Sequence, residues 1–159
     1  MSMFVSGLEI RAAKIQDLPC MMQVRTAVVE NHLSIEQMAE YGITLSSLAE
    51  MLTDSPCGWV AMMEDKIIGF AMVDNAAGSL FALFVLPAYA GRGIGSALLK
   101  IAEAQLFSQH QLIWLETGQS TRAAAFYRAK GWGDEQLISP EDIRLQKHRY
   151  SGQGQRLTR

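Results

Sequence analysis

One junction constrains the fold of this chain more than any other feature. From Phe84 to Ala104 the sequence reads FVLPAYAGRGIGSALLKIAEA: an apolar run, a proline, three glycines, and then a run with helical spacing. Pro87 predicts the end of a strand, because proline lacks the amide hydrogen that a sheet interior requires. The helix is predicted from apolar residues at positions i, i+3, i+4 and i+7, which are Ile94, Ala97, Leu98 and Ile101.

Three glycines stand between that strand and that helix, at Gly91, Gly93 and Gly95. A glycine has no β-carbon, so backbone N–H groups can approach a ligand closely. At the start of a helix those N–H groups lack intrahelical acceptors and lie at the positive end of the helix dipole. Arg92 adds a formal charge. A tight turn is the alternative, but it does not need three alternate glycines, so the loop predicts a phosphate site.

Two well-known nucleotide motifs do not fit this loop. The dinucleotide fingerprint G-x-G-x-x-G/A fails in both registers, since it ends on Ser96 when started at Gly91 and on Leu98 when started at Gly93. A P-loop requires Gly-Lys-Ser/Thr, which does not occur in the sequence. The predicted phosphate ligand is therefore neither a dinucleotide in a Rossmann fold nor a nucleoside triphosphate in a P-loop.

Alternating or nearly continuous apolar runs predict six strands, at residues 8–12, 58–64, 65–75, 80–86, 111–118 and 143–150. The strand at 80–86 is apolar throughout, which predicts burial on both faces. Four helical segments are predicted at 18–31, 33–53 with a break at Gly42, from Ile94 onward, and within 120–132, where the helix ends at Gly131. Their expected N-caps include Asp17, Ser34 and Thr44. This order predicts an α/β fold with a mixed sheet and helices packed on it.

Length and composition place the chain in one class. At 159 residues and 49% hydrophobic content it is expected to form a single globular domain over 1–159, with a flexible tail at 151–159. A net charge of −2 argues against nucleic acid or an anionic membrane as a partner. No apolar run approaches the ~20 residues of a membrane span.

Compartment and metal content follow from similar observations. The N-terminus shows no secretory pattern, so a cytoplasmic location is expected. Cys20 and Cys57 are then expected to be free thiols. The three histidines are dispersed and no Cys/His pair has ligand spacing, so no metal site is predicted.

The glycine loop closely resembles the coenzyme A-binding motif of the GNAT superfamily of N-acyltransferases. The family pattern [QR]-x-x-G-x-[GA] corresponds to residues 90–95, after a V-x-P strand end at Val85-Leu86-Pro87. AAAFYRAKGW at 123–132 resembles the family's A-x-x-F-Y-x-x-x-G-[FW] helix, and residues 58–74 resemble its strand hairpin. The resemblance runs from about Leu8 to Trp132. It implies a single GNAT-like domain with a mostly antiparallel central sheet.

The resemblance also implies how acetyl coenzyme A is held. The main chain of Leu83, Phe84 and Val85 would pair with the pantetheine arm. The pyrophosphate would lie on the loop made of Gly91, Arg92, Gly93, Ile94, Gly95 and Ser96. Ala90 departs from the family's Gln or Arg, so backbone amides rather than a side chain at this position are expected to bind the phosphates. Ser120 stands where many members carry a coenzyme-binding Asn, and it is equally plausible as a helix N-cap.

The sequence offers fewer candidates for catalysis than for coenzyme binding. By resemblance, Tyr127 would protonate the departing thiolate, the alternative being helix packing. Glu116 lies where some family members place a base, with an ion pair as its alternative. A water-relayed base also remains open, because Ser79 stands where many members carry an acid. A backbone amide before Pro87, that of Val85, would stabilise the oxyanion.

The resemblance therefore implies an N-acetyltransferase acting on a primary amine of a small molecule or a peptide by direct attack. A non-catalytic acyl coenzyme A sensor is the alternative. Glu30 and His32 are candidates for the acceptor pocket or for a solvated helix end. The acceptor itself cannot be identified from the segment 32–53. Homodimers are common in the superfamily, so a second copy is one expected partner.

Overall fold

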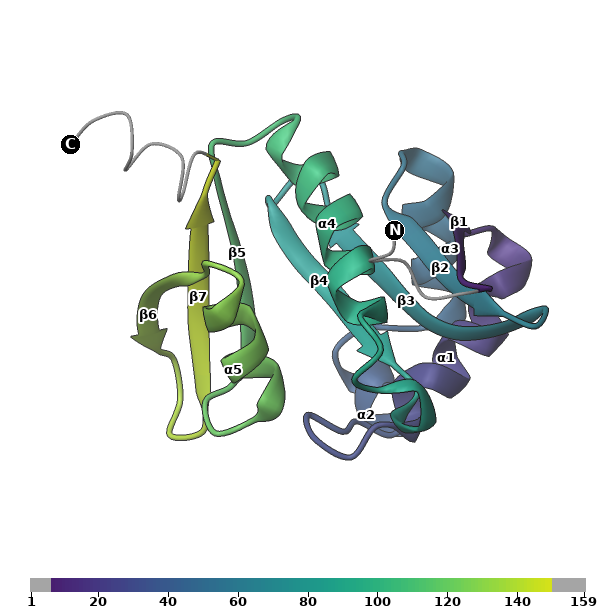
Figure 1. Cartoon of the computed structure of the whole chain (residues 1–159), viewed down its shortest axis with the longest axis horizontal. Helices are drawn as coiled ribbons and strands as arrows, with labels where there is room; N and C mark the ends of the chain where they lie inside the picture. Colours follow the sequence, from purple (N-terminus) through teal and green to yellow (C-terminus); the bar gives the residue numbers. More distant parts are fainter. Residues whose placement is uncertain (1–6, 150–159) are drawn as a thin grey trace.

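The structure is a computed structural model that describes residues 7–149. Its centre is a seven-stranded sheet with the order β1-β2-β3-β4-β5-β7-β6 (Figure 1). The strands are β1 (Glu9–Ala12), β2 (Gly58–Met63), β3 (Lys66–Asp74), β4 (Ser79–Val85), β5 (Leu112–Gly118), β6 (Gly133–Leu137) and β7 (Asp142–His148). The helices are α1 (Leu18–Ala27), α2 (Ile35–Glu40), α3 (Leu45–Asp54), α4 (Ile94–Phe107) and α5 (Arg122–Ala129), with 3-10 turns at Ile15–Asp17 and Pro87–Tyr89.

The sheet divides between β4 and β5, which form its parallel pair. These two strands share one backbone pairing, Ser79 with Trp114, and then diverge, as Figure 1 shows. A bulge accompanies the divergence: Met72 pairs with Ala82 and Val73 with Leu80, which leaves Phe81 as an extra residue in β4. A bulge increases the local twist of a strand. One edge of β4 beyond the bulge is therefore not covered by β5.

Helices cover both faces of the β3–β4 half (Figure 1). An added β-carbon on Gly69 would lie 3.3 Å from Val85 Cγ2 and 3.4 Å from Leu98 Cδ1, which places Val85 on the α4 face. Phe70 and Phe84 point to the opposite face, toward α1, with ring centroids 5.8 Å apart. The core residues that are completely buried include Val60, Ile68, Leu98, Leu106, Ile113 and Leu145.

Local signals placed most elements correctly. Ser34 and Thr44 cap α2 and α3, where their side-chain oxygens accept hydrogen bonds from the N–H groups of Gln37 and Ser47. The β2–β3 turn lies at Glu64 and Asp65 as predicted, with φ values of 53° and 62°. Two left-handed residues in succession suit a two-residue hairpin, because that turn follows the twist of the strands.

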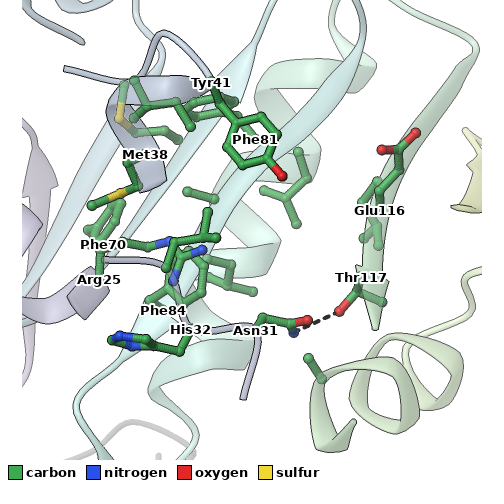
Figure 2. A pocket seen from close by; sticks show the side chains of 18 of the residues that line it. Arg25, Asn31, His32, Met38, Tyr41, Phe70, Phe81, Phe84, Glu116 and Thr117 are labelled. Carbon is green, nitrogen blue, oxygen red and sulfur yellow. Dashed lines mark hydrogen bonds between the residues drawn. The ribbon is translucent and has the colours of Figure 1, made fainter. Parts of the chain in front are cut away.

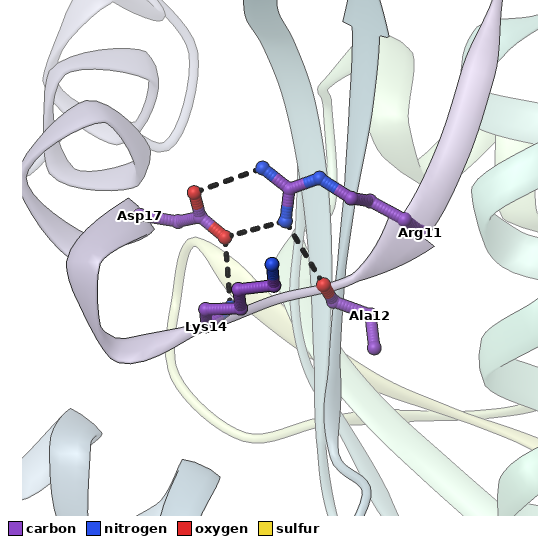
Figure 3. A network of polar contacts seen from close by, with 4 residues as sticks. All are labelled: Arg11, Ala12, Lys14 and Asp17. Atoms are coloured by element: carbon purple, nitrogen blue, oxygen red, sulfur yellow. Dashed lines mark hydrogen bonds and ion pairs between the residues drawn. The ribbon is translucent and has the colours of Figure 1, made fainter.

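Asp17 is the N-cap residue of the first helix, as predicted, but the expected side-chain capping hydrogen bond is absent. The Asp17 side chain does not cap α1, because its carboxylate is engaged upstream (Figure 3). It accepts hydrogen bonds from both terminal nitrogens of Arg11, at 2.7 and 3.0 Å, and from the Lys14 N–H at 2.7 Å. The helix also ends at Ala27 rather than continuing through residues 28–31, and Val29 is 84% exposed.

Two strand predictions need correction. β6 was missed, because it is an exposed edge strand with no apolar alternation, and β7 lies inside it rather than closing the sheet. Burial of β4 on both faces is also wrong, since Phe81 is 38% exposed beside the divergence. The expected flexible tail at 151–159 lies outside the described residues.

Two searches of the described part of the chain found nothing. Within residues 7–149 no helix has the length and apolarity needed to cross a bilayer. The same residues contain no cluster of three or more His, Cys, Asp or Glu side chains that could hold a metal ion.

Candidate functional site

The glycine loop has the geometry of an anion cradle. Gly91 and Gly93 adopt left-handed conformations, with φ of +78° and +82°, and Gly93 is the N-cap of α4. These conformations require glycine, because an L side chain there is strained. An added β-carbon at either position would meet no atom within 4 Å. The loop therefore combines a conformational need for glycine with open space above its backbone.

The loop amides are available to a ligand. The first hydrogen bond at the start of α4 runs from the Ala97 N–H to the Gly93 carbonyl, at 3.1 Å. The N–H groups of residues 91–96 accordingly donate to no group within the described chain. They lie at the positive end of a 14-residue helix. Arg92 lies over the Tyr89 ring, 5.2 Å from its centroid, and adds a charge. Backbone amides can thus hold a pyrophosphate without a side chain at Ala90.

The uncovered edge of β4 presents main-chain groups from alternate residues. The Leu86 N–H donates to the Ile68 carbonyl in β3, at 2.8 Å. The Phe84 carbonyl oxygen likewise faces β3, 3.0 Å from where a Gly69 β-carbon would lie. Since successive residues of a strand direct these groups to opposite edges, Leu83 and Val85 face the open edge. Of the three residues predicted to pair with the pantetheine arm, Leu83 and Val85 therefore present main-chain groups at the open edge, whereas the main-chain groups of Phe84 face β3.

A cavity of about 870 Å³ lies on the α1 face and reaches across the divergence (Figure 2). Its walls come from α1, the loop that follows α1, β3, β4, the end of β5 and α5. That volume suits a small molecule or a chain end. The lining side chains include Met21, Met22, Arg25, Asn31, His32, Met38, Phe70, Met72, Leu83, Phe84, Glu116, Thr117 and Tyr127.

Tyr127 lines this cavity while being only 7% exposed. Its ring packs edge-on against Phe126 and Trp132, with centroids 5.3 and 5.9 Å away. Burial raises the pKa of its phenol far above the ordinary value, because the phenolate is poorly solvated there. The hydroxyl thus stays protonated at neutral and moderately alkaline pH. Packing and an acid role are compatible at this position.

Glu116 also lines the cavity and is engaged in an ion pair. Its Oε2 lies 2.5 Å from Nη2 of Arg144, its cross-strand partner in β7. The Arg144 guanidinium in turn lies over Trp114, 4.0 Å from the ring centroid. Both members of the pair are more than one-third exposed. The ion pair and the cavity position occur together, so neither excludes the other.

Two of the remaining candidates, Ser120 and Glu30, do not line the cavity. Ser120 is exposed and does not cap α5; Thr121 does so, by accepting from the Ala124 N–H at 3.1 Å. The Glu30 carboxylate accepts a hydrogen bond from the Arg122 N–H at 2.8 Å, so it binds the start of α5 rather than lining the cavity. His32 does line it.

Sequence reasoning missed Arg25 and Asn31. Arg25 occupies the i+7 position of the apolar stripe that begins at Leu18 and continues with Met21 and Met22. A charge on the apolar face of a helix was the available signal. Asn31 has a φ of 56° and bonds to the end of β5, which no local pattern reveals.

A divergent mixed sheet with a glycine loop at the start of a helix defines a class of acyltransferase folds. Residues 54–133, half of the chain, match the family described as "Acetyltransferase (GNAT) domain". The chain belongs to the GNAT acetyltransferase family. No curated protein sequence matches it.

Solved structures share this fold. The PaiA N-acetyltransferase from Thermoplasma acidophilum, solved with coenzyme A, matches with a TM-score of 0.74 at 20% identity, over 89% of this chain and 98% of that one. The ribosomal-protein-S18-alanine N-acetyltransferase from Escherichia coli has a TM-score of 0.70 at 20% identity, over 89% and 93%. A ribosomal-protein-alanine N-acetyltransferase from Brucella melitensis has a TM-score of 0.67 at 23% identity, over 88% and 99%. At these identities the likeness shows the fold alone.

Proposed function

We propose that this protein transfers an acetyl group from acetyl coenzyme A to a primary amine of a small molecule or a peptide. The observation that carries the proposal is the run of available amides from Gly91 to Ser96 beside the open edge of β4. The first feature suits a pyrophosphate and the second an extended arm containing amide groups. Coenzyme A has both parts.

The bound coenzyme would supply an acetyl thioester, which is the electrophile. The pyrophosphate would lie on the amides of residues 91–96, and the pantetheine arm would pair with Leu83 and Val85. That arm leads along β4 toward the divergence from β5, where the cavity opens. The amine would enter from the α1 face, opposite the α4 face that holds the phosphates.

The chemistry assigns roles to three groups. The amine nitrogen attacks the thioester carbonyl, a C–N bond forms, and the C–S bond breaks. The Val85 N–H would donate to the oxyanion. The Tyr127 hydroxyl would give its proton to the leaving thiolate, and Glu116, directly or through a water, would accept the proton that the amine loses. An alkylamine of pKa ~10.4 costs about 4–5 kcal/mol to deprotonate at neutral pH, so a proton acceptor is useful.

Calorimetry with acetyl coenzyme A tests the coenzyme half of the proposal. We expect saturable binding by the natural sequence. Gly93→Ala adds only backbone strain, whereas Gly93→Glu adds the same strain and a negative charge. Binding should therefore weaken moderately in the first variant and vanish in the second. Equal affinity in both would contradict a phosphate site at the loop.

Release of free thiol in the presence of an amine panel tests the transfer half. Amine-dependent release, with an acetylated product of the expected mass, supports an enzyme. Coenzyme binding without turnover of any amine would favour the non-catalytic sensor instead. The departure at Ala90 and the absence of an acid at Ser79 are the features consistent with that alternative.

A further inference from the structure

Arg25 carries an unpartnered buried nitrogen on the wall of the cavity. Its Nη1 is buried and has no hydrogen-bond partner, and no carboxylate of residues 7–149 pairs with its guanidinium. The group lies over the ring of Phe84, 4.2 Å from the centroid. Burial lowers the pKa of Arg25, because a guanidinium loses solvation there. Arginine nevertheless stays charged in proteins. The structure therefore holds a charged side chain with an unsatisfied donor.

Packing alone does not account for an arginine at this place. The neighbouring positions on the same helical stripe are Met21 and Met22. A methionine at 25 would cover Phe84 without the desolvation cost of a charge. A partly buried cation without an internal counter-ion is best accounted for by an anion that comes from outside the chain.

The anion would belong to the acceptor rather than to the coenzyme. Arg25 and the Phe84 side chain lie on the α1 face, whereas the glycine loop lies at the start of α4 on the other face. Phe84 nevertheless stands between Leu83 and Val85, whose main chains form the open edge. Arg25 is thus close to the expected reaction centre but on the side from which the amine would enter.

We propose that Arg25 binds an anionic group, a carboxylate or a phosphate, on the amine that is acetylated. This inference rests on the proposed function and names the substrate class of the same site. Figure 2 shows Arg25 and Glu116 on opposite walls of the cavity. Met38, Phe70 and Met72 also line the cavity and supply apolar surface. The acceptor class is therefore a small amine that also carries an anion, such as an amino acid, rather than a peptide amino terminus.

Paired substrates test this directly. Leucine and leucinamide differ in the carboxylate, and phosphoethanolamine and ethanolamine differ in the phosphate. We expect one anionic member to be favoured over its neutral partner by about 10- to 100-fold in kcat/KM, the range of a charged hydrogen bond. Arg25→Met should abolish that preference, chiefly through KM, and Arg25→Lys should restore part of it. Arg128→Met, an exposed arginine paired with Glu135, is the matched control and should change nothing.

Thermal unfolding provides a readout that does not depend on turnover. Without ligand, Arg25→Met should melt at a higher temperature than the natural sequence, because it removes an unpaired charge. Leucine or phosphoethanolamine should raise the melting temperature of the natural sequence but not of Arg25→Met. A lower melting temperature for Arg25→Met, or no anion-dependent stabilisation, would overturn the inference.

The proposed function can fail separately. If the natural sequence does not bind acetyl coenzyme A, the proposed function is wrong. The changes in melting temperature with leucine or phosphoethanolamine still test whether Arg25 binds an anion. If Arg25→Met binds acetyl coenzyme A normally and neutral amines are acetylated as well as anionic ones by the natural sequence, the function stands and the role of Arg25 does not.

Discussion

The Asn31 side chain donates from Nδ2 to Oγ1 of Thr117, 3.1 Å away, and so ties the loop after α1 to the end of β5. Its Oδ1 also accepts from the Gly118 N–H, at 3.1 Å. Figure 2 shows the Asn31–Thr117 hydrogen bond at the cavity, between the loop after α1 and the end of β5. The loop thus closes one side of the cavity through hydrogen bonds between residues more than 80 positions apart.

Removal of the Asn31 side chain should open that rim. Asn31→Gly keeps the left-handed backbone but loses both hydrogen bonds, so unfolding should cost about 1–3 kcal/mol less. Asn31→Ala should be worse by about 1 kcal/mol or more, because alanine is strained at a φ of 56°. Hydrogen exchange should increase at residues 28–34, and the KM for the amine should rise. Unchanged exchange in that loop would contradict the assignment, and unchanged coenzyme affinity is the internal control.

Tyr127→Phe should slow turnover by about 100-fold, because the thiolate would lose its proton donor. Coenzyme affinity and melting temperature should hardly change, since the packing against Phe126 and Trp132 remains. The raised pKa keeps the natural phenol protonated, so Tyr127 should cause no fall in rate with rising pH up to about pH 10. Rate profiles against pH for both proteins measure this. A variant as fast as the natural enzyme at every pH would rule out the acid role.

Glu116→Gln should lower kcat/KM at pH 7 by about 100-fold if Glu116 accepts the amine proton. The defect should shrink near pH 10, where a larger share of the amine is already neutral. Arg144→Met keeps the carboxylate and removes its partner, so it should retain most activity. The free energy of unfolding of both variants should lie within about 1 kcal/mol of that of the natural sequence, as expected for a half-exposed ion pair. Full activity in Glu116→Gln would point to a water-relayed base.

Gly93→Ala should lower the stability of the protein, whereas Gly95→Ala should raise it. At Gly93 the positive φ makes alanine strained by about 1–2 kcal/mol, although a β-carbon there would meet no atom within 4 Å. At Gly95 a β-carbon would make an ordinary 3.7 Å contact with Phe126, and alanine should stabilise the helix by up to about 1 kcal/mol. Melting curves and calorimetry with acetyl coenzyme A compare them. Loss of coenzyme binding in Gly95→Ala would show that the phosphates need the space above Gly95 as well as its amide.

The Arg11–Asp17 pair should give a measurable acid dependence of stability. Hydrogen bonds from Arg11, opposed in part by burial and aided by the Lys14 N–H, hold the pKa of Asp17 below its ordinary 3.8. The stabilisation is therefore complete above about pH 4 and is lost as the pH falls through the lowered pKa. Asp17→Asn should cost about 1–3 kcal/mol at pH 7. Urea titrations from pH 2 to 7 should show that difference shrinking only below pH 4, and a constant difference would contradict the account.

Signals that lie within a few residues of each other were read correctly from the sequence. The caps at Ser34 and Thr44, the turn at Glu64 and Asp65, and the start of α4 after Gly93 are all decided by neighbouring side chains and backbone conformations. The resemblance in the glycine loop and the helix at 123–132 identified the family for the same reason: each motif is contiguous. The missed strand β6 had no such signal, because an exposed edge strand can be polar on both faces.

The sequence by itself determined the family and the order of most elements, and it predicted that the backbone of the glycine loop, rather than a side chain at Ala90, holds the phosphates. Only the tertiary structure decided that the main-chain groups of Phe84 face β3 while those of Leu83 and Val85 face the open edge, since that depends on strand register. It also decided that Asp17 serves Arg11, that Asn31 reaches Thr117, and that Arg25 is left without a partner. Each of those outcomes depends on atoms brought together from distant parts of the chain or on the absence of such atoms, which no local pattern encodes.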